Sequence, residues 1–121
     1  MKTKKNVFEN NFKQPEIKIK NETHLSISGN SISLRPEDSF KPLISWISGF
    51  KGDTLNIDIN LDLMNCRSVK LLLEAIVAVD INENISNKNI TWYFKDAEDQ
   101  ELGDMIASNI KNSKFKLFCM N

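Results

Sequence analysis

The run from Thr54 to Leu73 changes its hydrophobic period partway along, and this change constrains the fold more than any other feature. Between Leu55 and Leu63, leucine and isoleucine alternate strictly with asparagine and aspartate, which is the period of a strand with one buried and one solvated face. From Val69 onward the aliphatic residues recur at helical spacing. The sequence therefore predicts a strand that turns into a helix, over about Ser68 to Ile81, through the corner Asn65-Cys66-Arg67-Ser68.

The predicted corner has the chemistry of a binding site. A helix N-terminus offers unpaired backbone N–H groups and the positive end of the helix dipole, which suit an anion or a phosphorylated side chain. Arg67 adds a permanent cation, and Asp62 and Met64 lie just before the corner on the strand. We expect Asp62, Met64, Asn65 and Arg67 to bind a partner. Ser68 has two compatible interpretations, the helix N-cap, which we favour, and a phosphoacceptor.

The rest of the chain alternates between strand and helix patterns. The segments Glu16–Lys20 and His24–Ser28 alternate and are joined by three polar residues, which predicts a hairpin. Residues 36–50 have helical spacing, in which Pro42 predicts either two short helices or one kinked helix, with Gly52 as a C-cap. A loop at 82–89, a strand at 90–94, a helix with an acidic first turn and a last strand at 115–119 follow.

These elements predict a single α/β domain in the order ββαβαβαβ. Because most strands alternate rather than being apolar throughout, we expect a mixed sheet of four or five strands with about three helices mainly on one face. Residues 15–121 form this domain, and residues 1–14, which lack periodicity, are expected to be a mobile leader. Trp46 and Trp92 are expected in its core.

Composition and charge narrow the classes of function. The formal net charge is zero, which gives no electrostatic argument for nucleic acid as a partner. No apolar run approaches the roughly 20 residues of a membrane-spanning helix, and the two cysteines imply no disulfide framework. We therefore expect a cytoplasmic protein without a cofactor. Lysines gather in residues 1–20 and acidic residues in 96–104, either as a solvated tail and helix start or as two docking surfaces.

Three segments, which follow one another along residues 15–118, carry a resemblance to a known family. The first joins Gly29-Asn30-Ser31 to Phe40-Lys41-Pro42-Leu43-Ile44-Ser45-Trp46-Ile47, and is similar to a G-x-S stretch and a later aromatic-x-Pro helix. The second is the corner, which is similar to a strand that ends in N-T-S-S before a helix. The third is Ile90-Thr91-Trp92-Tyr93-Phe94 with the acidic run and Gly103, similar to a W-Y-x strand and an acidic helix start. The succession resembles the SiaC family of bacterial regulatory phosphoproteins.

This resemblance implies a non-enzymatic switch protein, with a fold similar in outline to the STAS-type anti-sigma-factor antagonists. In such a family a kinase phosphorylates the Thr of N-T-S-S and a phosphatase reverses the reaction. The unphosphorylated form engages an output protein, such as a diguanylate cyclase with a biofilm-type output. Here Cys66 stands at the Thr position and Arg67 at the following Ser. A thiol gives no stable O-phosphate ester, so the chain is either locked in one state or uses Ser68 as its phosphoacceptor.

Two other classes of function stay open. Cys66 could be the nucleophile of a small thiol enzyme, since a helix N-terminus and Arg67 favour a thiolate, although the single histidine, His24, is distant in sequence. The chain could instead be a structural dimerisation module, and we expect a monomer or a weak homodimer. Asp58 and Asp62 share one strand face and invite a metal interpretation, but alternating acids and amides equally suit a solvated face, so we expect no metal site.

Overall fold

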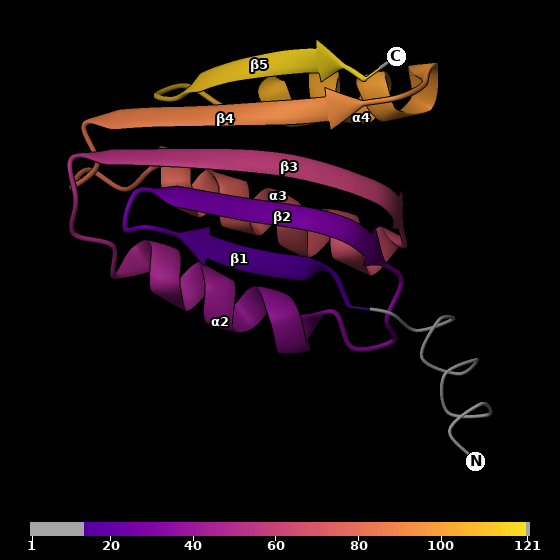
Figure 1. Ribbon diagram of the computed structural model, residues 1–121, viewed down its shortest axis with the longest axis horizontal. Coiled ribbons are helices and arrows are strands. Elements are labelled where there is room, and N and C mark those ends of the chain that lie inside the picture. The colour runs from indigo at the N-terminus through magenta and orange to yellow at the C-terminus, as the bar shows by residue number, and fades with distance from the viewer. Residues whose placement is uncertain (1–13, 121) are drawn as a thin grey trace.

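The computed structural model describes residues 14–120, which form one five-stranded sheet with three helices (Figure 1). Strands β1 and β2 are antiparallel, and β2 to β5 run parallel in chain order. The predicted mixed sheet and the order ββαβαβαβ are confirmed, whereas residues 1–13 of the predicted leader lie outside the described residues. The elements are β1 (Glu16–Lys20), β2 (His24–Ser31), α2 (Glu37–Ser48), β3 (Thr54–Met64), α3 (Cys66–Asp80), β4 (Asn87–Phe94), α4 (Ala97–Ala107) and β5 (Lys114–Cys119).

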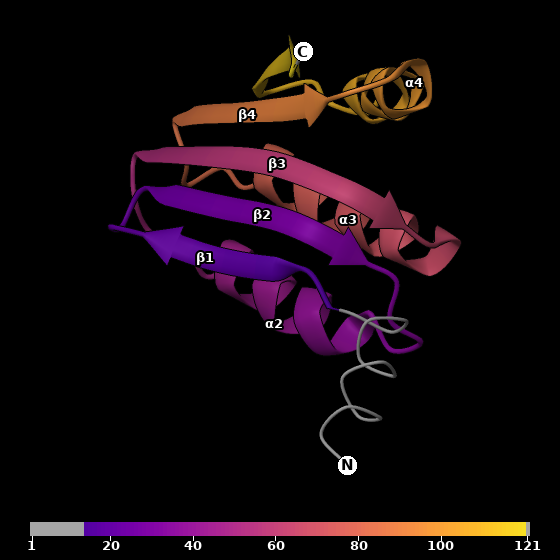
Figure 2. The ribbon, with the colours of Figure 1, turned by 45° about the vertical axis from the view of Figure 1, so that its right-hand side comes forward.

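All three helices cover the same face of the sheet (Figures 1 and 2). Each of α2, α3 and α4 connects a strand to its immediate neighbour, and every step proceeds in the same direction across the sheet. Because such crossovers are right-handed, steps in one direction leave all the helices on one side. Within residues 14–120, none of these helices is long and apolar enough to cross a membrane.

The core lies between the sheet and the helices, and β3 supplies its centre. Leu55, Ile57, Ile59 and Leu61 are each at most 4% exposed, as their alternation predicts. Leu63 is 59% exposed, which corrects the sequence prediction. Gly29 pairs with Leu61 and Asn30 with Leu63, so a β-bulge at Asp62 turns Leu63 to the open face of the sheet. Facing residues come from the helices and from β4, namely Phe40, Leu43, Ile47, Leu72, Ile76, Val79, Trp92 and Ile106. Trp92 is thus a core residue as predicted, whereas Trp46 is only half-buried.

The ends of two helices differ from the sequence prediction. Helix α2 is one helix that contains Pro42, and it ends at Ser48 with Gly49 as its C-cap, so the assignment of Gly52 was wrong. The ring of Pro42 faces solvent, where its loss of one backbone hydrogen bond is tolerated. Helix α3 begins at Cys66, two residues earlier than predicted, because Asn65 rather than Ser68 is its N-cap.

Asp80 fixes the far end of α3 to the loop before β5. Its carboxylate accepts hydrogen bonds from the backbone N–H groups of Lys111 (3.0 Å) and Asn112 (2.8 Å) and from the hydroxyl of Ser113 (2.8 Å). Burial raises the pKa of Asp80, but these bonds and the charge of Lys88 outweigh it and hold the pKa below its ordinary value. The ammonium of Lys88 donates to the backbone oxygen of Asp80 (2.6 Å).

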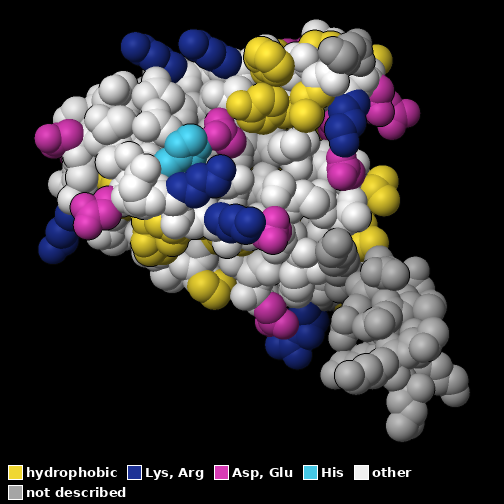
Figure 3. All heavy atoms as spheres, viewed as in Figure 1, with side chains coloured by type: hydrophobic (Ala, Val, Ile, Leu, Met, Phe, Trp, Pro, Cys, Tyr) yellow, Lys and Arg dark blue, Asp and Glu magenta, His cyan; other side chains and the backbone are white. Residues whose placement is uncertain are grey.

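No helix of the part of the chain that the structure describes covers the other face of the sheet, which is mostly polar (Figure 3). One row across all five strands consists of Lys18, Ser26, Asp58, Thr91 and Lys116. His24 also lies on this face, and its Nε2 is 2.5 Å from the carboxylate of Asp58. Lysines therefore flank a centre of small polar side chains.

Candidate functional site

Asn65 organises the corner between β3 and α3. Its side-chain oxygen accepts the backbone N–H of Ser68 (2.9 Å), which caps the helix, and its side-chain nitrogen donates to the backbone oxygen of Ser33 (2.8 Å). Its own backbone N–H donates to the backbone oxygen of Ser31 (3.0 Å). One residue thus ties the start of α3 to the end of β2 and to the loop that follows it.

Ser68 lies inside the corner rather than on its surface. Its hydroxyl accepts a hydrogen bond from the hydroxyl of Ser31 (2.7 Å), and both side chains are 0% exposed. Ser68 donates its backbone N–H to the cap but is not the cap itself. Sequence analysis missed the role of Ser31, although the G-x-S stretch at Gly29-Asn30-Ser31 was the available signal.

A second group of polar side chains supports the loop between β2 and α2. Gln14 donates to the hydroxyl of Ser33 and to the backbone oxygen of Arg35, each at 2.9 Å, and accepts from the hydroxyl of Ser39 (2.7 Å). The Ser33 hydroxyl also accepts the backbone N–H of Arg35 (3.0 Å). Ser33, whose backbone oxygen accepts from Asn65, is therefore also held through its own hydroxyl. Nothing in the local sequence pattern marks these long-range contacts.

Cys66 and Arg67 form the outer side of the corner. The Cys66 thiol is free and exposed at the first turn of α3. The guanidinium of Arg67 forms an ion pair with Glu37, the first residue of α2, so the cation bridges the N-termini of two helices. Because Arg67 is 65% exposed and Glu37 is only half-buried at 32%, solvent screens this pair and it contributes little to stability.

Asp62 and Met64 lie beside the corner, on a groove of about 290 Å³ between the end of β3 and the first turn of α4. Its lining combines leucine, methionine and valine side chains with carboxylates. The lining residues are Leu61, Asp62, Leu63, Met64, Val69, Asp96, Glu98, Asp99 and Leu102. Of the predicted residues, Asp62 and Met64 line this groove, whereas Arg67 reaches to Glu37 of α2. Cys66 is exposed at the corner, and Asn65 and Ser68 support the corner from within.

The charges around this groove influence one another. Asp62 forms an ion pair with Lys95, and this hydrogen bond raises the pKa of Lys95. Burial raises the pKa of Asp99, and the nearby charge of Asp96 raises it further, while a backbone hydrogen bond from Lys95 partly offsets both. The groove therefore presents a negative rim with one cation on it.

The exposed thiol of the corner has no histidine beside it. The chain has one histidine, and His24 stands at the start of β2 whereas the corner lies beyond its end, on the order of 20 Å away by strand rise. A Cys66 nucleophile therefore has no histidine to activate it. Within the described residues, no group of three or more metal-ligating side chains occurs.

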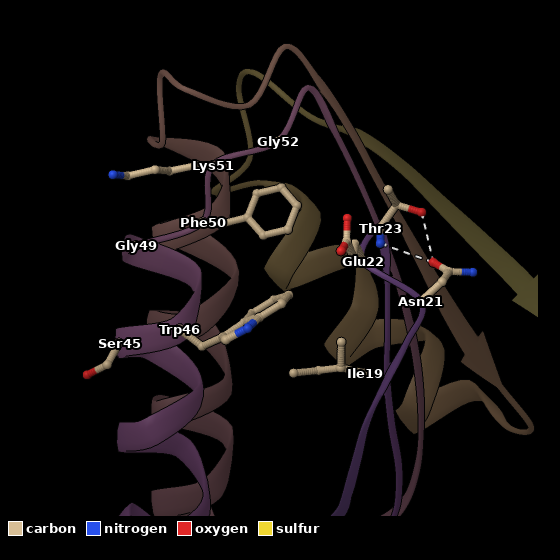
Figure 4. Close-up of a pocket in the computed structure, with 10 residues that line it drawn as sticks. All are labelled: Ile19, Asn21, Glu22, Thr23, Ser45, Trp46, Gly49, Phe50, Lys51 and Gly52. Carbon is tan, nitrogen blue, oxygen red and sulfur yellow. Dashed lines mark hydrogen bonds between the residues drawn. The ribbon is translucent and has the colours of Figure 1, made fainter.

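A second hollow, of about 550 Å³, lies between the β1–β2 turn and the C-terminal end of α2 (Figure 4). Ile19, Trp46 and Phe50 point into it, and the two aromatic ring centroids are 5.3 Å apart. Asn21 shapes the turn with φ of 43° and accepts both the N–H and the hydroxyl of Thr23. None of the predicted site residues lines this hollow, and Trp46 was expected in the core instead.

The fold and the corner together define a class, namely single-sheet α/β domains in which a capped helix follows directly on the end of an inner strand. The chain belongs to the SiaC family of regulatory phosphoproteins, since the family model matches residues 8–120. No curated protein sequence matches the chain significantly.

Solved structures of the SiaC protein of Pseudomonas aeruginosa share the fold. In its complex as activator of the diguanylate cyclase SiaD, that chain has a TM-score of 0.75 and 18% identity, with 88% of this chain and 93% of that chain covered. A second structure of the same protein has a TM-score of 0.74 and 18% identity, with 91% of this chain and 93% of that chain covered. Its apo form has a TM-score of 0.71 and 18% identity, with 87% of this chain and 90% of that chain covered. This chain is therefore similar in fold to SiaC over most of both lengths.

Proposed function

We propose that this chain is a partner-binding regulator that engages an output protein of the diguanylate cyclase class, and that it stays in the unphosphorylated, binding state. The observation that carries the proposal is the distribution of side chains in the corner. A thiol, Cys66, occupies the exposed position, while the hydroxyl of Ser68 is buried against Ser31. The chemical group that faces a partner or a kinase here is therefore one that forms no stable phosphate ester.

The burial of Ser68 argues against its use as a substitute phosphoacceptor. Phosphorylation would break the hydrogen bond to Ser31 and place about two negative charges in a fully buried position. A kinase would first have to open the first turn of α3, which Asn65 caps. We infer that phosphorylation at Ser68 would act by unfolding the corner rather than by adding charge to its surface.

The surface beside the corner supports binding of a protein. Leu63 is 59% exposed next to half-buried Met64, and carboxylates surround them. Apolar side chains within a polar rim are the usual composition of protein interfaces. A partner segment with aliphatic side chains and at least one lysine or arginine would complement this surface in shape and charge.

The proposal is tested by the binding of a purified diguanylate cyclase from the same organism to three forms of the chain. The wild type and Cys66→Ser, which keeps size and neutrality, are expected to bind equally well. Cys66→Glu, which mimics a charged phosphosite, is expected to weaken binding by tenfold or more, or about 1.4 kcal/mol. Asn84→Glu is the matched control, because Asn84 is exposed in the loop after α3, at the opposite end of that helix.

Two results would contradict the proposal. Equal binding by Cys66→Glu and Asn84→Glu would show that the partner does not contact the corner. Absence of binding by the folded wild type to every diguanylate cyclase of that organism would show that the output protein belongs to another class.

A further inference from the structure

Among residues 14–120, no strand pairs with the outer edge of β5. Strand β5 is the last of the sheet and pairs on its inner side with β4. Met120 donates its backbone N–H to the backbone oxygen of Phe94 (2.9 Å), and successive residues of a strand direct these groups to alternate sides. The backbone groups of Phe115, Leu117 and Cys119 therefore point outward, as a template for a further strand.

The side chains of this edge divide into a basic half and an apolar half. Lys114 and Lys116 occupy the first half, and Lys is a residue that proteins use to protect exposed edges. The second half carries Leu117, Phe118 and Met120, which are 37%, 57% and 41% exposed. Figure 3 shows dark-blue side chains followed by yellow ones along this part of the molecule. Only the first half of β5 therefore carries lysines that protect its edge against pairing with another strand.

We propose that the occupant of this edge is the β5 of a second copy of the chain, paired antiparallel about Leu117. In a symmetric antiparallel pair, residues on the same sheet face lie opposite one another. Centring on Leu117 places Phe115 opposite Cys119, Lys116 opposite Phe118 and Lys114 opposite Met120. Every lysine then faces an apolar side chain of the other copy, and the cation of Lys116 lies near an aromatic ring.

The alternative registers are less favourable for reasons that the sequence of β5 itself supplies. Centring on Lys116 would place two lysines directly opposite each other, which destabilises a strand pair. Centring on Phe118 would move Phe115 past Cys119 and shorten the hydrogen-bonded ladder. Charge and ladder length together therefore select the register about Leu117. The resulting dimer leaves the Asn65–Ser68 corner free, since β5 is two strands away from β3.

Charge reversal at one position tests this pairing in the full-length protein. By sedimentation equilibrium from micromolar to near-millimolar concentrations, the wild type is expected to dimerise reversibly. Phe118→Lys places lysines opposite Lys116 at two symmetric positions, whereas Phe118→Glu places carboxylates there. Both variants lose the same aromatic contact with Tyr93 (ring centroids 5.5 Å), so effects on the fold are matched. We expect the dimer dissociation constant of Phe118→Lys to exceed that of Phe118→Glu by about tenfold.

A charge swap and a cross-link complete the test. Adding Lys116→Glu to Phe118→Lys restores opposite charges and is expected to restore dimerisation. In a background of Cys66→Ser and Cys119→Ser, Lys116→Cys and Phe118→Cys are expected to form an intermolecular disulfide only when the two variants are mixed. A monomeric wild type, equal weakening by both Phe118 substitutions, or a disulfide that forms as readily in either variant alone would overturn the proposal.

Discussion

Replacement of Asn65 by alanine tests the architecture of the corner most simply. The substitution removes the acceptor for the Ser68 N–H and the donor to the backbone oxygen of Ser33. Loss of an N-cap costs about 1 kcal/mol, and loss of a second, partly buried hydrogen bond costs about another 1 kcal/mol. We therefore expect the free energy of unfolding to fall by about 2 kcal/mol. For a chain of this size the melting temperature would fall by roughly 8 °C.

Two further variants separate the contributions. Asn65→Asp keeps the acceptor for Ser68 but turns a carboxylate oxygen toward the Ser33 carbonyl, so it should lose only about 1 kcal/mol. Asn84→Ala removes an exposed loop amide and should change stability by less than about 0.5 kcal/mol. Urea denaturation followed by far-UV circular dichroism gives the free energies, with the slope of each curve as a check on cooperativity.

The reasoning would be refuted by either of two results. If Asn65→Ala were as mild as Asn84→Ala, the corner would not depend on the cap, and its rigid geometry could not explain where a partner binds. If Asn65→Asp were as damaging as Asn65→Ala, the bond to Ser33 would matter and the helix cap would not.

Three other predictions concern the core, the charges and the thiol. Gly103→Ala brings a Cβ within 2.7 Å of the buried Trp92 ring, so thermal denaturation should show a net loss of about 1–2 kcal/mol despite better helix propensity. Asp80→Asn should cost about 1–3 kcal/mol near neutrality. Because folding lowers the pKa of Asp80, the charged carboxylate stabilises the fold above about pH 4, and this stabilisation disappears as the pH falls. The difference in the free energy of unfolding between wild type and Asp80→Asn should therefore shrink when both are unfolded at acid pH. Iodoacetamide should modify Cys66 no faster than a model thiol at neutral pH; faster reaction would favour the thiol enzyme.

The elements were predictable where the signal is local. The alternation of β3 and the helical spacing after it follow from side chains a few residues apart, and the structure confirms both. The alternation of most strands also predicted that the helices would cover one face of the sheet. The end of β3 was mispredicted at Leu63 because the β-bulge opposite Gly29 and Asn30 reverses the alternation there, and no local pattern indicates that bulge.

The interior of the corner was not predictable in the same way. Asn65 and Ser68 are both good N-cap residues, and the choice between them depends on Ser31, which is 37 positions from Ser68. The same holds for Lys88, which was expected in a loop but is a buried residue of β4. Its ammonium donates to the backbone oxygen of Asp80 at the end of α3, and no local pattern indicates such a contact.

Phosphorylation of the corner tests the central claim most directly. Wild type and Cys66→Thr are incubated with a kinase from the same organism that phosphorylates the N-T-S-S motif of SiaC-family proteins. The modified residue is then located by mass spectrometry. The account predicts that the wild type remains unmodified and that Cys66→Thr gains one phosphoryl group on the introduced threonine. A wild type phosphorylated at Ser68 would contradict it, because the buried serine would then be the switch and the chain would not be fixed in one state.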